Sequence, residues 1–149
     1  MTYPSIRDET AHADIVRRLG HLGPDSVRLW GVMDPGQLLP HLVDGVRLAL
    51  RDEGPAGRGL LATSVMRRLM IHRAAWPPGK AKAPPGAFQR TMRSWDGDRQ
   101  ELFELLDRYR ATPPERIRAG HPVFGRMKPG DWDVLVWRHL DHHLRQFGA

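Results

Sequence analysis

Apolar residues recur at helical spacing in four segments of this 149-residue chain, and stretches rich in glycine and proline separate these segments. A helix with apolar residues along one side must bury that side against another element. No segment shows a convincing strand pattern. The sequence therefore predicts an all-α protein, and its length fits a single domain that spans residues 1–149.

The four predicted helices have recognisable starts and stops. They span, in order, about residues 8–22, 34–51, 98–110 and 129–147. Asp34-Pro35 is a sound helix start, because an acceptor side chain is followed by a residue with a fixed φ. The stretches WGVMDPGQ and FGRMKPGD share a pattern and precede the second and the fourth helix, which predicts that both helices begin in similar ways.

The start of the third helix has two interpretations. Asp98 and Glu101 have the spacing of a capping box, which places the start at Asp98. An earlier start near Ala87 would extend the apolar stripe, although the turn-forming pair Asp96-Gly97 argues against it.

A long insertion, residues 54–93, separates the second helix from the third. It is predicted to contain an additional helix at about residues 58–75, followed by the proline-rich loop WPPGKAKAPPG. A loop of this length in a compact domain is often functional, as a lid or as a dimer contact. The alternative is a simple surface excursion.

Composition limits the classes of function. The net charge is +6, but the basic residues are mostly arginines spread along the chain, and no nucleic-acid-binding motif is present. A basic nucleic-acid binder would instead bind DNA in a salt-sensitive way through the segment MRRLMIHR. No apolar run reaches the roughly 20 residues needed to span a bilayer, and the N-terminus has no apolar signal core, so we expect a soluble, cytoplasmic protein without a membrane partner.

The last predicted helix holds three of the eight histidines of the chain, in the stretch WRHLDHHLRQFG. Residues four apart on a helix differ by about 40° in direction, and residues three apart by about 60° the other way. His139 and His143 therefore share the apolar side of this helix, whereas His142 lies off its centre. The apolar side is defined by Trp132, Leu135, Val136, Leu140 and Phe147.

The second predicted helix also has an inward-facing histidine. His41 lies on the same side as Leu38, Leu42 and Leu48. Gly45, one turn beyond His41, leaves space for a close helix approach or a cavity. Pro40 directly precedes His41, so either this helix begins nearer Gln37 or it kinks at the histidine.

Three core-facing imidazoles need partners, because burying each without one costs roughly 1–3 kcal/mol. A divalent metal would meet the requirement of all three at once and would keep at least one coordination position for water. The chain has no cysteine, so metal ligands must be histidine nitrogens, carboxylate oxygens or water. The alternative is that each imidazole separately hydrogen-bonds a carboxylate or carbonyl. The residues leave both open.

Peptidase chemistry of the zincin type is excluded, because its helix needs a glutamate directly after the first histidine and Leu140 occupies that position. No inward carboxylate is an obvious general base. Asp44, about one turn from His41, and His142, at the mouth of the site, are the candidate catalytic residues. For each of them a solvated surface position is the alternative.

The remaining histidines are assigned simpler roles. His121, in HPVFG, is predicted to order the loop before the last helix, with a role in a pocket as the alternative. His12, His21 and His72 have no partner at ligand spacing, so we interpret them as surface residues.

Two motifs resemble a known family. The stretches WGVMDPGQLLPHL and HPVFGRMKPGDWDVLVWRHLDHHLRQFG are similar to the DinB/YfiT-like superfamily of four-helix-bundle metalloenzymes. The closest resemblance is to a branch whose last helix carries HLxHHxRQFG. The motifs cover about a third of the chain.

The resemblance implies an up-down-down-up four-helix bundle, here with the additional helix and long loop between helices two and three. It also implies a metal held by one histidine of the second helix and an HxxxH pair of the last, which by position are His41, His139 and His143. Zinc or nickel, a low-molecular-weight thiol as cosubstrate and a homodimer are implied in the same way.

Two hypotheses of different class follow. The first is a metal-dependent enzyme, a hydrolase or a thiol transferase, acting on a small molecule with the metal as Lewis acid. The second is a non-catalytic dimeric helical bundle, an interaction or stress-response protein whose histidines are only structural.

Overall fold

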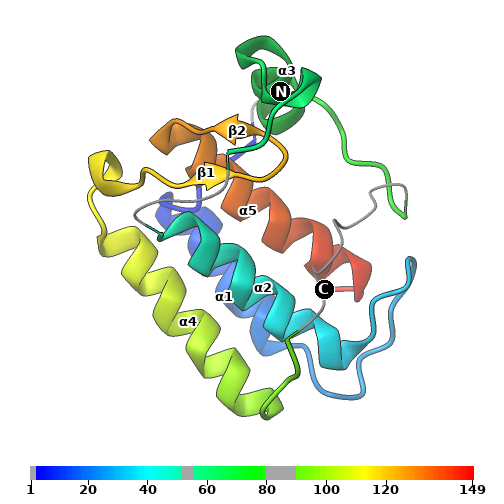
Figure 1. Ribbon diagram of the computed structural model, residues 1–149. Helices are drawn as coiled ribbons and strands as arrows, with labels where there is room; N and C mark the ends of the chain where they lie inside the picture. Colours follow the sequence, from blue (N-terminus) through cyan, green and yellow to red (C-terminus); the bar gives the residue numbers. More distant parts are fainter. Residues whose placement is uncertain (1–2, 52–55, 80–89) are drawn as a thin grey trace.

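Five α-helices make up most of the computed structural model, which describes residues 3–51, 56–79 and 90–149 (Figure 1). They are α1 (Glu9–Gly20), α2 (Pro35–Ala49), α3 (Ser64–His72), α4 (Trp95–Ala111) and α5 (Pro129–Gln146). Two 3-10 turns, η1 (Leu60–Ala62) and η2 (Pro114–Arg116), and two short strands, β1 (Gly120–His121) and β2 (Gly125–Arg126), connect them. The predicted all-α class is confirmed. No helix among these residues is long and apolar enough to cross a membrane.

The four long helices lie side by side around one apolar core. The helix α2 packs against both α4 and α5, and α1 packs against α5. In Figure 1, α1 and α5 run in one direction and α2 and α4 in the other. Each helix buries the apolar side predicted from its spacing, with fully buried residues that include Ile15, Leu42, Leu106 and Leu140. This arrangement places the inner sides of α2 and α5 against each other.

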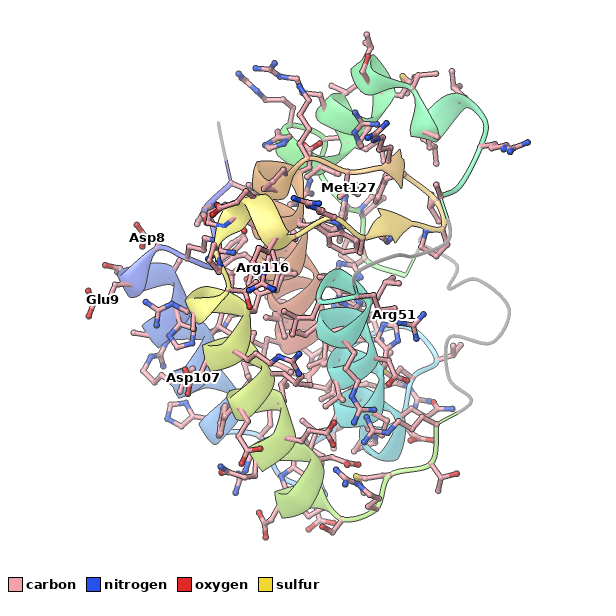
Figure 2. The ribbon with its side chains drawn as sticks, turned by 60° about the vertical axis from the view of Figure 1, so that its left-hand side comes forward. Asp8, Glu9, Arg51, Asp107, Arg116 and Met127 are labelled. Carbon is pink, nitrogen blue, oxygen red and sulfur yellow. The ribbon has the colours of Figure 1, made fainter. Side chains whose placement is uncertain are left out.

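Local hydrogen bonds explain where the helices begin. Asp8 caps α1 by accepting a hydrogen bond from the amide of Ala11 (3.0 Å), and Glu9 adds a negative charge to the first turn (Figure 2). At α2, the Asp34 carboxylate accepts from the Gln37 amide (2.9 Å), and the Gln37 side chain accepts in return from the Asp34 amide (3.1 Å).

The predicted similarity between the starts of α2 and α5 is confirmed, since both begin at the proline of the shared pattern. The helix α2 starts at Pro35 and continues through Pro40, so the alternative start near Gln37 is wrong. At α5, Asp131 accepts a hydrogen bond from the backbone amide of Lys128 (3.3 Å), which ties the carboxylate of the first turn to the residue before it.

The predicted start of α4 at Asp98 is wrong. The helix begins at Trp95, and Ser94 is its cap, accepting from the amide of Gly97 (3.0 Å). Asp98 has a fully buried side chain that pairs with the guanidinium groups of Arg90 and Arg93 (3.2 and 3.0 Å). Its carboxylate therefore serves a tertiary ion pair, which a spacing rule cannot reveal. The alternative start near Ala87 lies outside the described residues.

The expectation that the chain contains no strand is also wrong. The strands β1 and β2 form an antiparallel hairpin in which Gly120 faces Arg126 and His121 faces Gly125. Each strand has two residues, which is too short for alternation to be visible in the sequence. Gly125 has a φ of 70°, which favours glycine at the turn. The hairpin leads into α5 and holds His121 beside it.

The helix predicted within the insertion is shorter than expected, since α3 covers nine residues, Ser64–His72. Two side chains of α3 bind one carboxylate at the start of α5. Arg67 Nε lies 3.2 Å from one Asp131 oxygen, and His72 Nε2 lies 2.8 Å from the other. Most of the proline-rich loop WPPGKAKAPPG falls within residues 80–89, which lie outside the described residues.

Arg138 of α5 provides the second attachment of α3. Its buried guanidinium donates to the carbonyl oxygens of Met70 (2.6 Å), Ile71 (2.8 Å) and Ala74 (2.6 Å), at the end of α3. The same group lies over the ring of Trp76, 4.2 Å from its centre. A basic side chain that ends a helix in this way satisfies carbonyls that the helix itself leaves unpaired.

Replacing Arg138 by methionine is therefore expected to destabilise the fold by about 1–2 kcal/mol, because three carbonyl groups lose their donor and water reaches them only in part. Urea unfolding followed by circular dichroism measures this change. Arg145→Met is the matched control, since Arg145 on the same helix is largely exposed and forms only a surface ion pair with Asp141. Equal effects of the two substitutions would contradict the anchoring role of Arg138.

Candidate metal site and adjoining cavity

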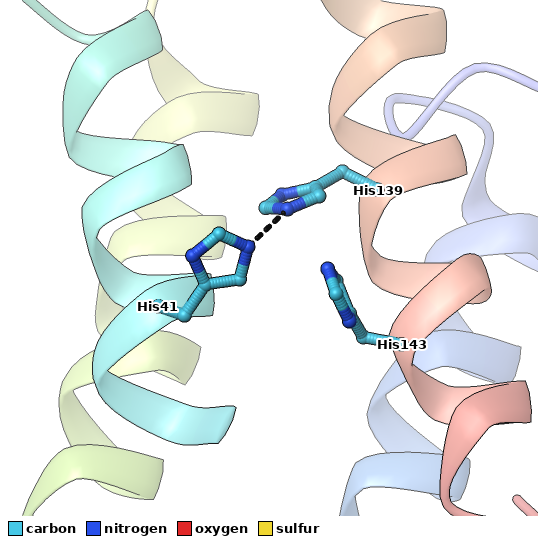
Figure 3. Close-up of side chains that lie close together, drawn as sticks. All are labelled: His41, His139 and His143. Atoms are coloured by element: carbon cyan, nitrogen blue, oxygen red, sulfur yellow. Dashed lines mark hydrogen bonds between the residues drawn. The ribbon is translucent and has the colours of Figure 1, made fainter. Parts of the chain in front are cut away.

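The three histidines singled out by helical spacing meet between α2 and α5 (Figure 3). His41 projects from α2, and His139 and His143 project from successive turns of α5. The centres of their rings form a nearly equilateral triangle with sides of 4.7, 4.8 and 4.8 Å. One nitrogen from each ring lies within 4.8 Å of the others, so the cluster could hold a metal ion.

Gly45 makes room for this cluster on α2. A Cβ atom at position 45 would lie 2.8 Å from Nδ1 of His139 and 2.9 Å from its Cε1, which is closer than side-chain atoms approach. The imidazole of His139 therefore rests directly on the backbone of α2. The space that the sequence predicted beside His41 is occupied by the histidine of the opposite helix.

Gln146 fixes the orientation of His143. The side-chain amide of Gln146 donates to the carbonyl of Trp30 (2.9 Å), so its oxygen must face Nδ1 of His143, at 2.8 Å. Nδ1 then carries the proton, and Nε2 keeps its lone pair. Gln146 was not among the predicted site residues, although its position three residues after His143 on one helix is a signal in the sequence.

Close packing also fixes Gln146 itself. Gly31 has a φ of 78°, and a Cβ atom there would lie 2.5 Å from the side-chain nitrogen of Gln146. The connector between α1 and α2 thus passes directly over Gln146. Gly31 thus leaves room for Gln146, which orients His143, and Gly45 leaves room for the ring of His139.

The surroundings keep the α5 imidazoles neutral. Burial, reinforced by the neighbouring His41 and His143, holds the pKa of His139 well below its ordinary value. Burial and the proximity of His41 lower the pKa of His143 to about 3, although its hydrogen bond to Gln146 acts in the opposite direction. At neutral pH both rings therefore offer lone pairs, which is the state that metal ligation requires.

The three nitrogens are close enough to hold a small divalent ion once the rings adjust their spacing. Nε2 of His41 and Nε2 of His139 lie 2.8 Å apart and share a hydrogen bond. Metal–nitrogen bonds of about 2.0–2.1 Å at tetrahedral angles would set these atoms roughly 3.3 Å apart. The rings of His41 and His139 would have to separate by about half an ångström, and the nitrogen of His143, which lies within 4.8 Å of the other two, would have to come to the same spacing.

The cluster opens on a cavity of about 570 Å³, a size typical of small-molecule sites. Its walls are mostly apolar, and α3 and the segment after it contribute Met70, Ala75, Trp76 and Pro77. The described part of the insertion therefore builds one wall of the cavity. Among the described lining residues, the titratable ones are His41, Asp44, His121 and His139.

Asp44, a candidate catalytic residue, lies at the lining of this cavity but is about half exposed. Its carboxylate pairs with Arg90 (3.5 Å) and more distantly with Arg47 (3.9 Å). Asp44 therefore lies at the cavity on the same helix as His41, but its carboxylate is also engaged by two arginines.

The alternative that His142 is a solvated surface residue is wrong. Its side chain is buried, with 8 % of the residue exposed. The ring lies edge-on between Trp30 and Trp76, with centres 4.7 and 5.9 Å away, and it also contacts His143 at 5.2 Å. The connector and the insertion both fold over this side of α5, and neither contact could be predicted from helical spacing.

Two of the three histidines interpreted as surface residues are partly buried. His12 contacts Arg110 through Nδ1 (3.1 Å), and burial lowers its pKa. His72 binds Asp131, as described above. Only for His21 is the exposed position confirmed. None of these three belongs to the metal cluster.

His121 has the ordering role predicted for it. Its Nδ1 accepts hydrogen bonds from the backbone amides of Val123 (3.0 Å) and Phe124 (3.2 Å), which closes the turn of the hairpin. The alternative role is also supported by position, because the ring lines the cavity. Burial lowers the pKa of His121 to about 4.

The depressed pKa of His121 predicts acid sensitivity. The unfolded chain binds a proton near pH 6.5 while the folded one does not, so folding stability falls as the pH drops from 6.5 towards 4. At pH 5 this histidine is expected to contribute about 1–2 kcal/mol of destabilisation relative to pH 7. Urea unfolding of metal-free wild type and of His121→Asn at both pH values isolates the effect, which must be smaller in the variant.

A family model described as "Protein of unknown function (DUF1569)" matches residues 6–149. No curated protein and no solved structure matches the chain.

Proposed function

This chain belongs to the family described as Protein of unknown function (DUF1569), and we propose that it is a metal-dependent enzyme with a three-histidine site. The ligands are His41, His139 and His143, and the ion is zinc or nickel. The observation that carries the proposal is the convergence of three imidazole nitrogens, within 4.8 Å of one another, beside a mostly apolar cavity. The reaction class is hydrolysis or thiol transfer on a small molecule.

The donor set supports this chemistry. A divalent ion supplies Lewis acidity, which lowers the pKa of a coordinated water or thiol towards neutrality. Three neutral imidazoles leave the full positive charge on such an ion, because the cluster contains no carboxylate among the described residues. Gln146 keeps Nε2 of His143 available as a ligand. Asp44 is the carboxylate among the described lining residues, and we assign it the role of general base, which accepts a proton at the cavity wall.

The packing supports a DinB-like four-helix bundle as the scaffold of this function. The contacts of α2 with α4 and α5 and of α1 with α5 are those of four adjacent helices, and their directions in Figure 1 match an up-down-down-up order. The ligands then come from the second and the last helix of the bundle, as in the superfamily that the two motifs resemble. A low-molecular-weight thiol is the cosubstrate that this resemblance favours.

One observation favours the rival function, a non-catalytic bundle with structural histidines. His41 and His139 hydrogen-bond each other, and His143 bonds Gln146, so the three rings have partners without a metal. The two hypotheses differ in a measurable way, because a structural cluster has no need to gain an ion.

Metal analysis of protein purified without a histidine tag separates the two. The proposed function predicts about one divalent ion per chain, either as purified or after incubation with zinc, nickel or manganese followed by desalting. A metal content that stays well below one under all these conditions favours the structural cluster. Cobalt-loaded protein adds a spectroscopic test, since its visible absorption reports a low coordination number with nitrogen ligands.

A further inference from the structure

His121 is held firmly at the wall of the cavity. Its carbonyl accepts a hydrogen bond from the amide of Gly57 (2.9 Å), which ties the hairpin to the insertion. Its ring packs against Phe124 and Trp132, with centres 4.9 and 5.5 Å away. The imidazole therefore has a fixed position on the same cavity as His41 and His139.

The hydrogen bonds of His121 also fix its tautomer. Nδ1 accepts from two backbone amides, so it cannot carry a proton. In the neutral ring the proton must then be on Nε2, which makes this atom a hydrogen-bond donor. Within the described residues, Nε2 of His121 has no hydrogen-bond partner.

The other polar side chains of the lining are already engaged. The indole nitrogen of Trp76 donates to the carbonyl of Met70 (3.1 Å), and that of Trp132 donates to the carbonyl of Ala119 (2.8 Å). His41 and His139 belong to the proposed metal site, and Asp44 offers only acceptors while ionised. Among the described lining residues, His121 is the side-chain donor left for a ligand.

We infer that the cavity binds an uncharged, largely apolar molecule whose carbonyl-type oxygen accepts a hydrogen bond from Nε2–H of His121. The inference rests on the proposed function, because it names the substrate class of that same site. Apolar walls favour an apolar body, and a neutral donor favours a neutral acceptor. Away from the proposed ion, no lining side chain among the described residues carries a permanent positive charge that could pair with an anion, so the body of the ligand that fills the rest of the cavity is uncharged.

Two substitutions separate the roles of the two ring nitrogens. In His121→Asn the shorter amide can replace Nδ1 as acceptor for the turn, but it cannot reach the position of Nε2. In His121→Gln the longer amide can place a donor near the position of Nε2, but it loses the acceptor for the turn. If His121 is purely structural, His121→Gln is expected to destabilise the fold more than His121→Asn does. If Nε2 of His121 binds the ligand, His121→Asn is expected to weaken ligand binding more than His121→Gln does.

Acetophenone and ethylbenzene serve as probes, because they have similar shapes and only the first has a carbonyl oxygen. Their dissociation constants are measured by chemical-shift titration of ¹⁵N-labelled protein, both metal-free and zinc-loaded. The ratio of the two constants cancels most of the difference in hydrophobicity between the probes when variants are compared. His121→Asn is expected to shift this ratio against acetophenone by about 3- to 10-fold, and His121→Gln to shift it by less.

A second measurement does not depend on the variants. Acetophenone, but not ethylbenzene, should shift the ring ¹⁵N resonance of Nε2 in wild-type His121. An unchanged ratio in His121→Asn together with an unmoved ring resonance overturns the inference, as does failure of both probes to bind the wild type. A shifted ratio in a protein that never gains metal supports the ligand class while rejecting the metal-dependent function. Metal uptake with an unchanged ratio supports the metal-dependent function while rejecting the ligand class.

Discussion

Replacing His139 by alanine is expected to abolish metal binding, and His143→Ala is expected to do the same. Each ring provides one of three nitrogens that lie within 4.8 Å of one another, and two imidazoles alone hold a divalent ion weakly. The loss in affinity should exceed the roughly 10- to 100-fold that removal of a residue supporting a ligand produces. Competition with a chromophoric chelator measures the dissociation constant of zinc for each variant.

His142→Ala is the matched control for these substitutions. His142 lies between the two α5 ligands in sequence and contacts the His143 ring, yet its own ring points between Trp30 and Trp76. This variant is expected to lose thermal stability, because a buried ring is removed, but to retain about one metal per chain. Equal loss of metal in all three alanine variants would mean that the wrong side of α5 was chosen.

The positions of the helices could be predicted wherever local chemistry determines them. Asp34 and Pro35 define the start of α2 with a cap and a fixed φ, and both features act within four residues of the chain. Asp98 also has a local capping signal, the spacing to Glu101, but it has a different role, since its carboxylate binds Arg90 and Arg93 in the interior. Capping patterns fail where a tertiary ion pair competes for the same side chain.

The candidate site was predictable to the extent that one helix face determines it. The spacing of His139 and His143 places both rings on the side of α5 that faces α2, and His41 lies on the facing side of α2. What covers the other sides of α5 depends on segments distant in sequence. The burial of His142 therefore could not be predicted, because it requires Trp30 from the connector and Trp76 from the insertion.

The residues that support the histidines, Gln146 and Gly45, were also predictable only as far as local spacing determines their contacts. Gln146 follows His143 at a spacing that allows contact on a helix, but its own orientation depends on the carbonyl of Trp30. Gly45 was recognisable as a small residue beside His41. That its missing side chain accommodates the ring of His139 is a property of the α2–α5 packing, which only the structure reveals.

Gly45→Ala is expected to weaken zinc binding by roughly 10- to 100-fold while leaving the helix intact. The added Cβ atom would lie 2.8 Å from Nδ1 of His139, so the ring must move away from α2 and from the two other ligands. Forcing extra atoms into a packed interior commonly costs about 1–3 kcal/mol, and here the cost falls on the geometry of a ligand. Chelator competition and metal content measure the loss.

Helix propensity acts in the opposite direction, which makes the result diagnostic. Alanine in place of glycine within a helix is worth about 0.5–1 kcal/mol, so a Gly45→Ala variant with no steric conflict would be more stable and would bind zinc normally. Gly20→Ala is the matched control, because Gly20 also lies in a helix and a Cβ atom there meets nothing within 4 Å. If Gly45→Ala behaves like this control in both stability and zinc affinity, His139 does not need its present position against α2, and the metal site cannot have the geometry described above.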